Sequence, residues 1–150
     1  AMKFLVDTNL ISELTKARPD PAVRAWVSAH DAEMVMCWVS VAELRSGVAL
    51  LPQGRRRDQL HEDVEALIED FYEESEVPLQ GATAEMVAML AERNRAAGLA
   101  QGWPDIVIAA VAVEHGLVVA TRNTSDFPGI PTINPSEAPT ASGESGGRDA

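Results

Sequence analysis

The stretch Phe4-Leu5-Val6-Asp7-Thr8-Asn9 decides the fold and contains the first candidate functional residue. A continuous apolar run is typical of a strand buried on both faces of a parallel sheet, and this run ends abruptly in a carboxylate. We expect a strand over residues 3–6 and a short helix over residues 10–16. Asp7 then follows the carboxyl end of a strand, which is where parallel α/β sheets bind ligands.

Apolar segments alternate with amphipathic ones along the rest of the chain. Strands are predicted over residues 34–39, 77–79, 117–120 and 131–133. Helices are predicted from residue 21 onward and over residues 40–51, 55–72, 83–97 and 104–115. This alternation indicates an α/β protein whose parallel sheet is covered by helices on both faces. The helix over residues 104–115 is apolar almost all round, so we expect it between the sheet and a second helix or subunit.

Length and composition predict one domain in the cytoplasm. The chain has 150 residues, of which 46% are hydrophobic, and we place the domain at residues 2–135. Residues 136–150 are small, polar and rich in glycine, so we expect a disordered tail. No apolar run approaches the ~20 residues that cross a bilayer, and the start lacks the apolar region of a signal peptide. The single cysteine, Cys37, permits no internal disulfide and suits a reducing compartment.

The net charge of −11 argues against a uniformly basic surface for nucleic acid. Basic residues nevertheless gather away from the acidic stretch over residues 62–76, which leaves room for a local basic path. The candidates for that path are Arg45, Arg93, Arg95, Arg122 and the arginine run at 55–57. The alternative for the arginine run is a solvated helix start. An acidic body also suits a basic protein partner.

Four acids are expected at one edge of the sheet. Asp7 follows the first strand, and Glu43 lies in the first turn of the helix after the second strand. Asp105 begins the helix that runs back to the 117–120 strand, and Asp126 lies in the loop after that strand. All four therefore point to the rim formed by the carboxyl ends of the strands.

Each of these acids also has a purely structural explanation. Asp7 can cap the first helix, and Ser40 with Glu43 fits a capping box. Asp105 suits the dipole at a helix N-terminus, and Asp126 can form an Asx turn. Taken together the structural explanations weaken, because four carboxylates in one partly desolvated cleft repel one another. A divalent cation removes that repulsion, and all-oxygen ligands favour Mg²⁺ or Mn²⁺.

Four motifs resemble the PIN-domain family, and within it the VapC-type toxins of bacterial toxin–antitoxin pairs. The predicted helices over residues 40–51 and 55–72, with the stretch 51–57 that joins them, resemble the FitB branch of that group. The motifs are Val6-Asp7-Thr8-Asn9, Ser40-Val41-Ala42-Glu43-Leu44-Arg45-Ser46-Gly47, Asp105-Ile106-Val107-Ile108-Ala109-Ala110 and Ala120-Thr121-Arg122-Asn123-Thr124-Ser125-Asp126-Phe127. The resemblance covers about residues 2–135. It implies a three-layer α/β/α fold whose sheet has five parallel strands in the order 3-2-1-4-5.

The resemblance also implies an activity and partners. Asp7, Glu43, Asp105 and Asp126 are expected to bind Mg²⁺ or Mn²⁺ and to hydrolyse RNA phosphodiesters, with Asp126 acting directly or through a water. Thr8, Thr121 and Asn123 match polar positions beside the metal and are expected to hydrogen-bond a carboxylate or a water. The expected partners are RNA, a second copy of the chain and a cognate antitoxin that inserts a segment into the acidic site.

Other classes of protein fit the sequence less well. A haloacid-dehalogenase-like phosphatase needs a second Asp where this chain has Asn9, and a late Lys where none follows Lys16. This chain lacks the paired acids that a receiver-type signalling module needs. It also has no G-x-G-x-x-G after the first strand, so it does not match a dinucleotide-binding protein. The alternative that stays open is a catalytically silent PIN domain that binds protein or RNA.

Overall fold

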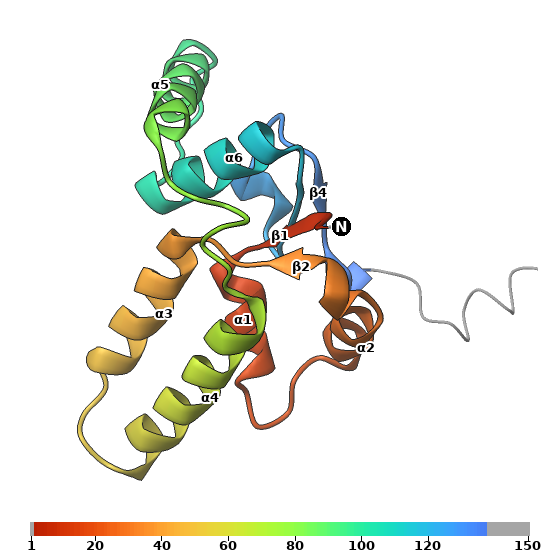
Figure 1. Ribbon diagram of the computed structural model, residues 1–150, viewed down its shortest axis with the longest axis vertical. Helices are drawn as coiled ribbons and strands as arrows, with labels where there is room; N and C mark the ends of the chain where they lie inside the picture. Colours follow the sequence, from red (N-terminus) through yellow and green to blue (C-terminus); the bar gives the residue numbers. More distant parts are fainter. Residues whose placement is uncertain (1, 138–150) are drawn as a thin grey trace, which may run out of the picture.

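Four short parallel strands form the centre of the computed structural model, which describes residues 2–137 (Figure 1). They are β1 (Phe4–Val6), β2 (Met34–Val35), β3 (Val118–Ala120) and β4 (Thr132–Ile133). Their spatial order is β2-β1-β3-β4, and every pairing is parallel. The predicted α/β class with a parallel sheet is therefore confirmed.

One predicted strand is wrong. Residues 77–79 form no strand, so the described part of the chain has four strands where five were expected. The edge beside β2 instead meets the end of a helix, through a single parallel bridge between Met36 and Tyr72. The Met36 amide donates to the Phe71 carbonyl at 2.8 Å. Pro78 offers no N–H to a ladder, which disfavours a strand at the predicted place. The order of the other four strands is as predicted.

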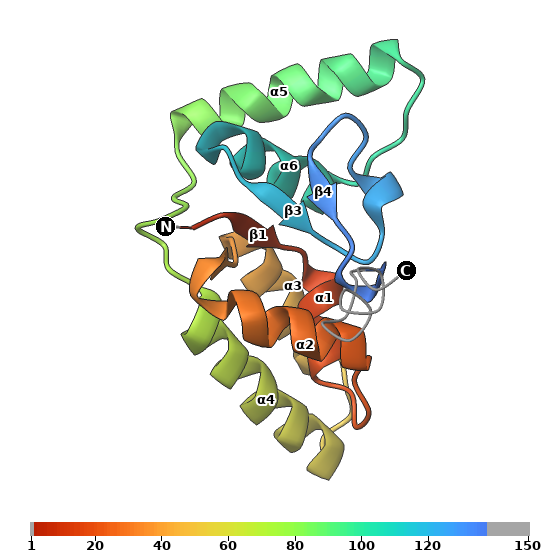
Figure 2. The same cartoon turned by 90° about the vertical axis from the view of Figure 1, so that its right-hand side faces the viewer.

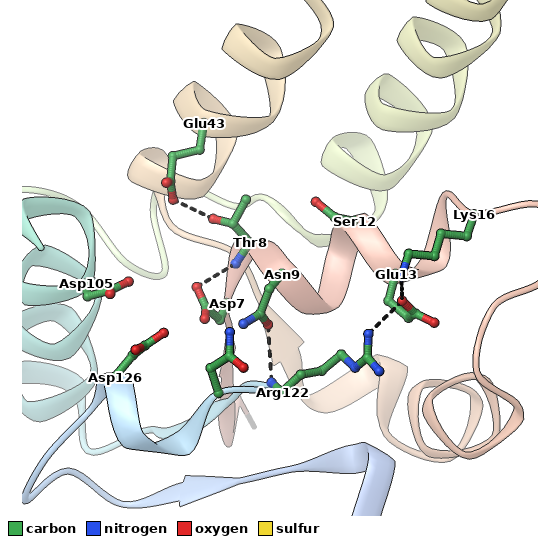
Figure 3. A pocket seen from close by; sticks show the side chains of 11 residues that line it. Asp7, Thr8, Asn9, Ser12, Glu13, Lys16, Glu43, Asp105, Arg122 and Asp126 are labelled. Carbon is green, nitrogen blue, oxygen red and sulfur yellow. Dashed lines mark hydrogen bonds and ion pairs between the residues drawn. The ribbon is translucent and has the colours of Figure 1, made fainter.

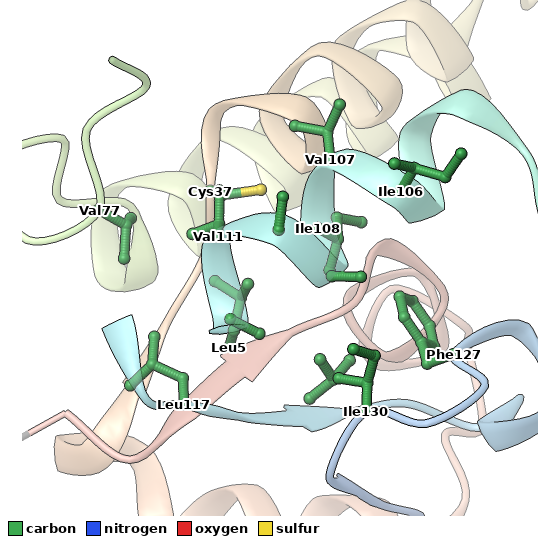
Figure 4. Close-up of a cluster of buried hydrophobic side chains, with 14 of the residues drawn as sticks. Leu5, Cys37, Val77, Ile106, Val107, Ile108, Val111, Leu117, Phe127 and Ile130 are labelled. Carbon is green, nitrogen blue, oxygen red and sulfur yellow. The ribbon is translucent and has the colours of Figure 1, made fainter. Parts of the chain in front are cut away.

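Alternate side chains of β1 enter two separate cores, as expected for a strand with covered faces. Leu5 packs with Val119 and with apolar residues of the later helices, including Ile108 (Figure 4). Val6 packs on the opposite face with Leu10 and other residues of the earlier helices. Both β1 side chains are fully buried. The apolar run of the first strand therefore connects the two halves of the hydrophobic interior.

Six α-helices in residues 2–137 cover the two faces of the sheet (Figures 1 and 2). One face carries α1 (Thr8–Leu14), α2 (Pro21–His30), α3 (Trp38–Ala49) and α4 (Arg55–Phe71). The other carries α5 (Gly81–Ala96) and α6 (Trp103–His115). Helix α6 lies between the sheet and α5, which is one of the two environments predicted for it. Within residues 2–137, no helix has both the length and the apolar character needed to span a bilayer.

Several element boundaries differ from the prediction in ways that affect the site. Helix α1 begins at Thr8 rather than at residue 10, directly after Asp7. The second strand ends at Val35, and α3 begins at Trp38 with buried Cys37 as its N-cap residue. Short 3-10 helices occur at Asp31–Glu33, between α2 and β2, and later at Thr124–Asp126 and Pro135–Glu137. Most of the predicted tail, residues 138–150, lies outside the described residues.

Candidate active site

Asp7 is held at the carboxyl end of β1 by contacts to both of its side-chain oxygens. Its Oδ1 accepts a 2.8 Å hydrogen bond from the Thr8 backbone N–H, so Asp7 is the N-cap of α1. Its Oδ2 accepts a 2.9 Å hydrogen bond from the Thr121 hydroxyl. The Asp7 side chain is only 5% exposed. Asp7 can therefore cap α1 and still bind a ligand, because each carboxylate oxygen keeps a free lone pair after accepting its hydrogen bond.

Thr121 follows β3 as Asp7 follows β1, and the register of the two strands brings them together. Val6 pairs with Ala120, and the Asp7 amide donates to the Ala120 carbonyl at 2.9 Å. The buried Thr121 hydroxyl donates to Asp7 and accepts from the Asn9 amide at 3.2 Å and the Asn123 backbone N–H at 3.0 Å. All three hydrogen-bonding positions of this hydroxyl are thus filled. Thr121 therefore fixes the Asp7 carboxylate, while its expected place beside a metal stays a prediction.

Glu43 approaches the same site from α3. Because α3 begins at Trp38, Glu43 lies in the second helical turn rather than the first, and the predicted capping box with Ser40 does not form. Its Oε1 instead accepts a 2.7 Å hydrogen bond from the Thr8 hydroxyl. That hydroxyl also lies 3.1 Å from the buried Ser40 hydroxyl. Thr8 therefore links Glu43 to the helix that Asp7 caps.

Asp105 and Asp126 come from the opposite side of the site. Asp105 lies in the first turn of α6 behind Pro104, as predicted. Asp126 ends the 3-10 helix Thr124–Asp126 within the predicted polar loop. The Asp126 backbone carbonyl accepts a 2.7 Å hydrogen bond from the side chain of Gln101, which precedes α6. The segments that carry the two acids are thereby joined.

All four acids line one cavity of about 480 Å³ at the carboxyl edge of the sheet (Figure 3). Thr8, Asn9 and Asn123 line it as well, while Thr121 supports it from below the surface. Figure 3 shows Asp7 at the centre, with Asp105 and Asp126 on one side and Glu43 above. The structure thus brings together the four acids and the three polar residues that the sequence singled out.

The electrostatics of the cavity oppose ionisation of Asp7 and Asp105. Burial raises the pKa of Asp7 to about 6, and Glu43 and Asp126 add to the rise against the lowering effect of the Thr121 and Thr8 hydrogen bonds. Burial also raises the pKa of Asp105 to about 6, with further contributions from Asp7, Asp126 and Glu43. Asp7 and Asp105 therefore feel the charge of neighbouring acids, and a cation in the cavity would relieve this repulsion.

The donor set fits a hard divalent cation, although it is not assembled into a complete coordination shell. In residues 2–137, no group of three or more His, Cys, Asp or Glu side chains is close enough together to hold a metal ion. Carboxylates that repel one another across an open cavity are expected to stand apart. Mg²⁺ usually keeps several waters and takes only one or two protein carboxylates, so the spacing and the all-oxygen chemistry are compatible with it.

The arginine candidates for a nucleic-acid path fall in different places. Arg122 lines the cavity. Arg45 pairs with Glu65 at 3.0 Å and lines a separate cavity of about 430 Å³ between α3 and α4. Arg93 donates to the Pro128 carbonyl at 2.6 Å and to Asn94 at 3.0 Å, so it connects α5 to the loop that follows Asp126. Arg95 is exposed in the last turn of α5.

Sequence reasoning did not identify several residues of the cavity and its support. Asn9 accepts a 3.2 Å hydrogen bond from the Arg122 backbone N–H, and Glu13 and Lys16 line the end of the cavity beyond it. Asn9 and Glu13 are four residues apart, a spacing that places both on one face of a helix and was an available signal. Gln101 lies outside every motif, so its contact with the Asp126 loop had no signal in the sequence.

Comparisons with known proteins identify one family. A family model described as PIN domain matches residues 4–131. The VapC ribonuclease Y4jK of Sinorhizobium fredii is 40% identical over 137 residues, which are 89% of this chain and 98% of that protein. Toxin FitB of Neisseria gonorrhoeae is 37% identical over 125 residues, which are 83% of this chain and 90% of that protein.

A solved structure shows the same fold. The crystal structure of FitAcB from Neisseria gonorrhoeae contains a chain with a TM-score of 0.79 and 31% identity to this one. The match covers 90% of this chain and 99% of that chain. The family match over residues 4–131 includes all four acids of the cavity.

Proposed function

Because the chain belongs to the PIN-domain family, we propose that it is a Mg²⁺- or Mn²⁺-dependent endoribonuclease and the toxin of a toxin–antitoxin pair. The family assignment confirms the one predicted from the four sequence motifs. The observation that carries the enzymatic proposal is the shared cavity, where acids from four separate segments of the chain meet at one edge of the sheet.

The residues of the cavity have distinct parts in the proposed reaction. Asp7 and Asp105 are the best-placed ligands, because burial and mutual repulsion give both of them the most to gain from a cation. Glu43 and Asp126 would contact the ion directly or through water. A bound Mg²⁺ or Mn²⁺ would lower the pKa of a bound water and neutralise charge on a phosphoryl oxygen.

The side chains of the cavity would activate the attacking water and hold the acids in place. A carboxylate of the cavity can orient the attacking water or accept its proton. Thr121 keeps the Asp7 carboxylate in one orientation, and Thr8 does the same for Glu43. Such fixed partners limit the motion of the acids, which favours a productive geometry.

The toxin role and the partners follow from the relatives. Toxin FitB and the VapC ribonuclease cover nearly the whole domain, so we extend their printed roles to this chain. The expected antitoxin is a protein with a basic segment, since acids outnumber basic residues in the lining of the cavity and the chain carries a net charge of −11. We also propose a homodimer in the cytoplasm.

Cleavage of RNA tests the enzymatic proposal. Purified wild type, Asp7→Asn and Asp105→Asn are incubated with RNA and Mg²⁺ or Mn²⁺, beside an Asp70→Asn control that removes an exposed acid outside the cavity. Wild type and the control should cleave, and both cavity variants should lose at least a hundredfold in rate. Equal cleavage by all four proteins would refute the proposal.

One observation favours a second candidate function, a catalytically silent PIN domain. The described residues contain no preassembled group of three ligands, which a binding module would not need. Absence of cleavage by wild type in both metals, together with capture of a protein partner, would support this alternative. Growth arrest on expression of wild type, but not of Asp7→Asn, would support the toxin instead.

A further inference from the structure

The cavity has two ends of opposite charge. Asp7, Asp105 and Asp126 lie at one end, and Lys16 and Arg122 lie at the other, beyond Asn9 (Figure 3). Helix α1 begins beside the acids and ends near Lys16, so it spans the distance between the two ends. Helix α1 has seven residues, which corresponds to roughly 10 Å along its axis, and Lys16 lies two residues beyond its end. One extended ligand can therefore contact both ends of the cavity at once.

A single buried carboxylate holds both cations at the second end. Glu13 is 5% exposed, and its Oε2 lies 2.8 Å from Arg122 Nη1 and 2.6 Å from Lys16 Nζ. Its Oε1 accepts a 3.0 Å hydrogen bond from the Asp20 backbone N–H. Lys16, the Asp20 amide and Arg122 hold the pKa of Glu13 below its usual range, so it stays ionised. One negative charge against two positive charges leaves this end with a surplus of one positive charge.

Arg122 is oriented before any ligand arrives. Its Nε donates to the Ser136 hydroxyl at 3.1 Å, and its backbone N–H donates to Asn9. A guanidinium has five N–H donors in a fixed plane, and the bonds to Glu13 and Ser136 use two of them. A planar donor group held in this way is suited to phosphate oxygens. Lys16 adds a charge that is largely exposed, with 59% of its side chain accessible.

We propose that Arg122 and Lys16 form a subsite for a second phosphate of the RNA strand whose scissile phosphate lies at the acidic end. The proposal rests on the proposed function, because it assigns the second contact of the same substrate. The length of α1, roughly 10 Å, places this phosphate outside the cleaved linkage, further along the strand. The subsite also answers how a protein with a net charge of −11 retains a polyanion at its site.

Kinetics with a short single-stranded RNA test the subsite. Lys16→Gln and Arg122→Gln should each raise KM about five- to tenfold with kcat within twofold of wild type. Each should also lower the slope of log affinity against log salt by about 0.7, which is the expected loss for one cation on a single strand. Arg24→Gln, which removes an exposed arginine of α2 outside the cavity, should change neither.

A second measurement separates phosphate binding from a purely structural ion pair. A single neutral methylphosphonate linkage is moved along the RNA, and binding is measured with the Asp105→Asn variant so that no strand is cut. One position outside the cleaved linkage should weaken binding, and adding Lys16→Gln should abolish the effect of that position alone. Absence of such coupling, or an unchanged KM in both cation variants, would overturn the subsite.

Failure of the subsite and failure of the enzyme are distinguishable in these experiments. Cleavage by wild type with an unchanged KM in Lys16→Gln and Arg122→Gln refutes only the subsite. Absence of cleavage by wild type refutes the proposed activity, and the methylphosphonate series still decides whether the cationic end binds RNA. An acidic peptide that binds wild type but not Lys16→Gln, without any RNA coupling, would assign this end to a protein partner instead.

Discussion

The side chain of Gln101 donates a 2.7 Å hydrogen bond to the backbone carbonyl of Asp126, so the loop before α6 fixes the position of the fourth cavity acid. Gln101 is itself held by buried Asn94, whose amide donates to Gln101 Oε1 at 2.5 Å. Arg93 reaches the same loop through the Pro128 carbonyl. The cavity therefore depends on α5, although α5 contributes no side chain to its lining.

Loss of the Gln101 contact should loosen the Asp126 loop. Gln101→Ala is expected to lower kcat/KM for RNA about three- to tenfold and to weaken Mn²⁺ binding, with a loss of about 1 kcal/mol in the free energy of unfolding. The exposed Gln53→Ala is the matched control and should change none of these. A stability loss with unchanged Mn²⁺ affinity would show that Gln101 supports the fold and not the site.

The hydroxyl of Thr8 should matter more than its methyl group. Thr8→Val removes the donor to Glu43 while keeping the shape, and we expect at least a tenfold loss in cleavage, typical of a partner that orients a ligand. Thr8→Ser keeps the donor and should retain most of the activity. Measured rates that are equal for the two variants would mean that Glu43 needs no orientation by Thr8.

Neutralising Asp7 should stabilise the metal-free protein. The pKa of Asp7 is raised from 3.8 to about 6, so its charge is costly at neutral pH, and Asp7→Asn should gain about 1–3 kcal/mol in the free energy of unfolding by urea. Asparagine also caps helices well, so α1 should persist. Asp20→Asn at the N-cap of α2 controls for the cap and should be nearly neutral. A lower free energy of unfolding for Asp7→Asn than for wild type would contradict the cost of a charged Asp7.

The same raised pKa values predict how stability depends on pH. Between pH 4 and about 6 the folded protein binds more protons at Asp7 and Asp105 than the unfolded chain does. The contribution of these two groups to metal-free stability is therefore full at acid pH and is lost as the pH rises through about 6. Urea unfolding from pH 4 to 7 should show a shallower decline for the double variant Asp7→Asn/Asp105→Asn. The same decline with pH in wild type and in the double variant would contradict the raised pKa values of Asp7 and Asp105.

Local patterns predicted the fold best where a single segment determines its own structure. The apolar run at residues 4–6, the Asp20 cap and the Pro104-Asp105 helix start all occur as expected. The strand over residues 77–79 was wrong because Val77 is buried by packing without pairing to the sheet, while Leu79 is exposed. A burial signal alone does not distinguish these two outcomes.

The candidate site was predicted in its four acids and in three of its polar supports, but not in the loop contacts that hold Asp126. Thr121 was placed beside the site by the family resemblance, and the register of β1 and β3 brings it to Asp7. Glu43 was assigned to the wrong helical turn, because a capping-box pattern at Ser40 competed with a start at Trp38. The contacts of Gln101 and Arg93 join residues 25 and 35 positions apart through loops, which no local pattern specifies.

Binding of Mn²⁺ to the purified protein tests most directly whether the four acids form a metal site. Calorimetric titration of wild type should give saturable binding, and the metal should raise the melting temperature. Asp105→Asn should bind at least tenfold more weakly, while Asp70→Asn should match wild type. Equal Mn²⁺ affinity in wild type and Asp105→Asn, or no saturable binding to wild type, would contradict the account.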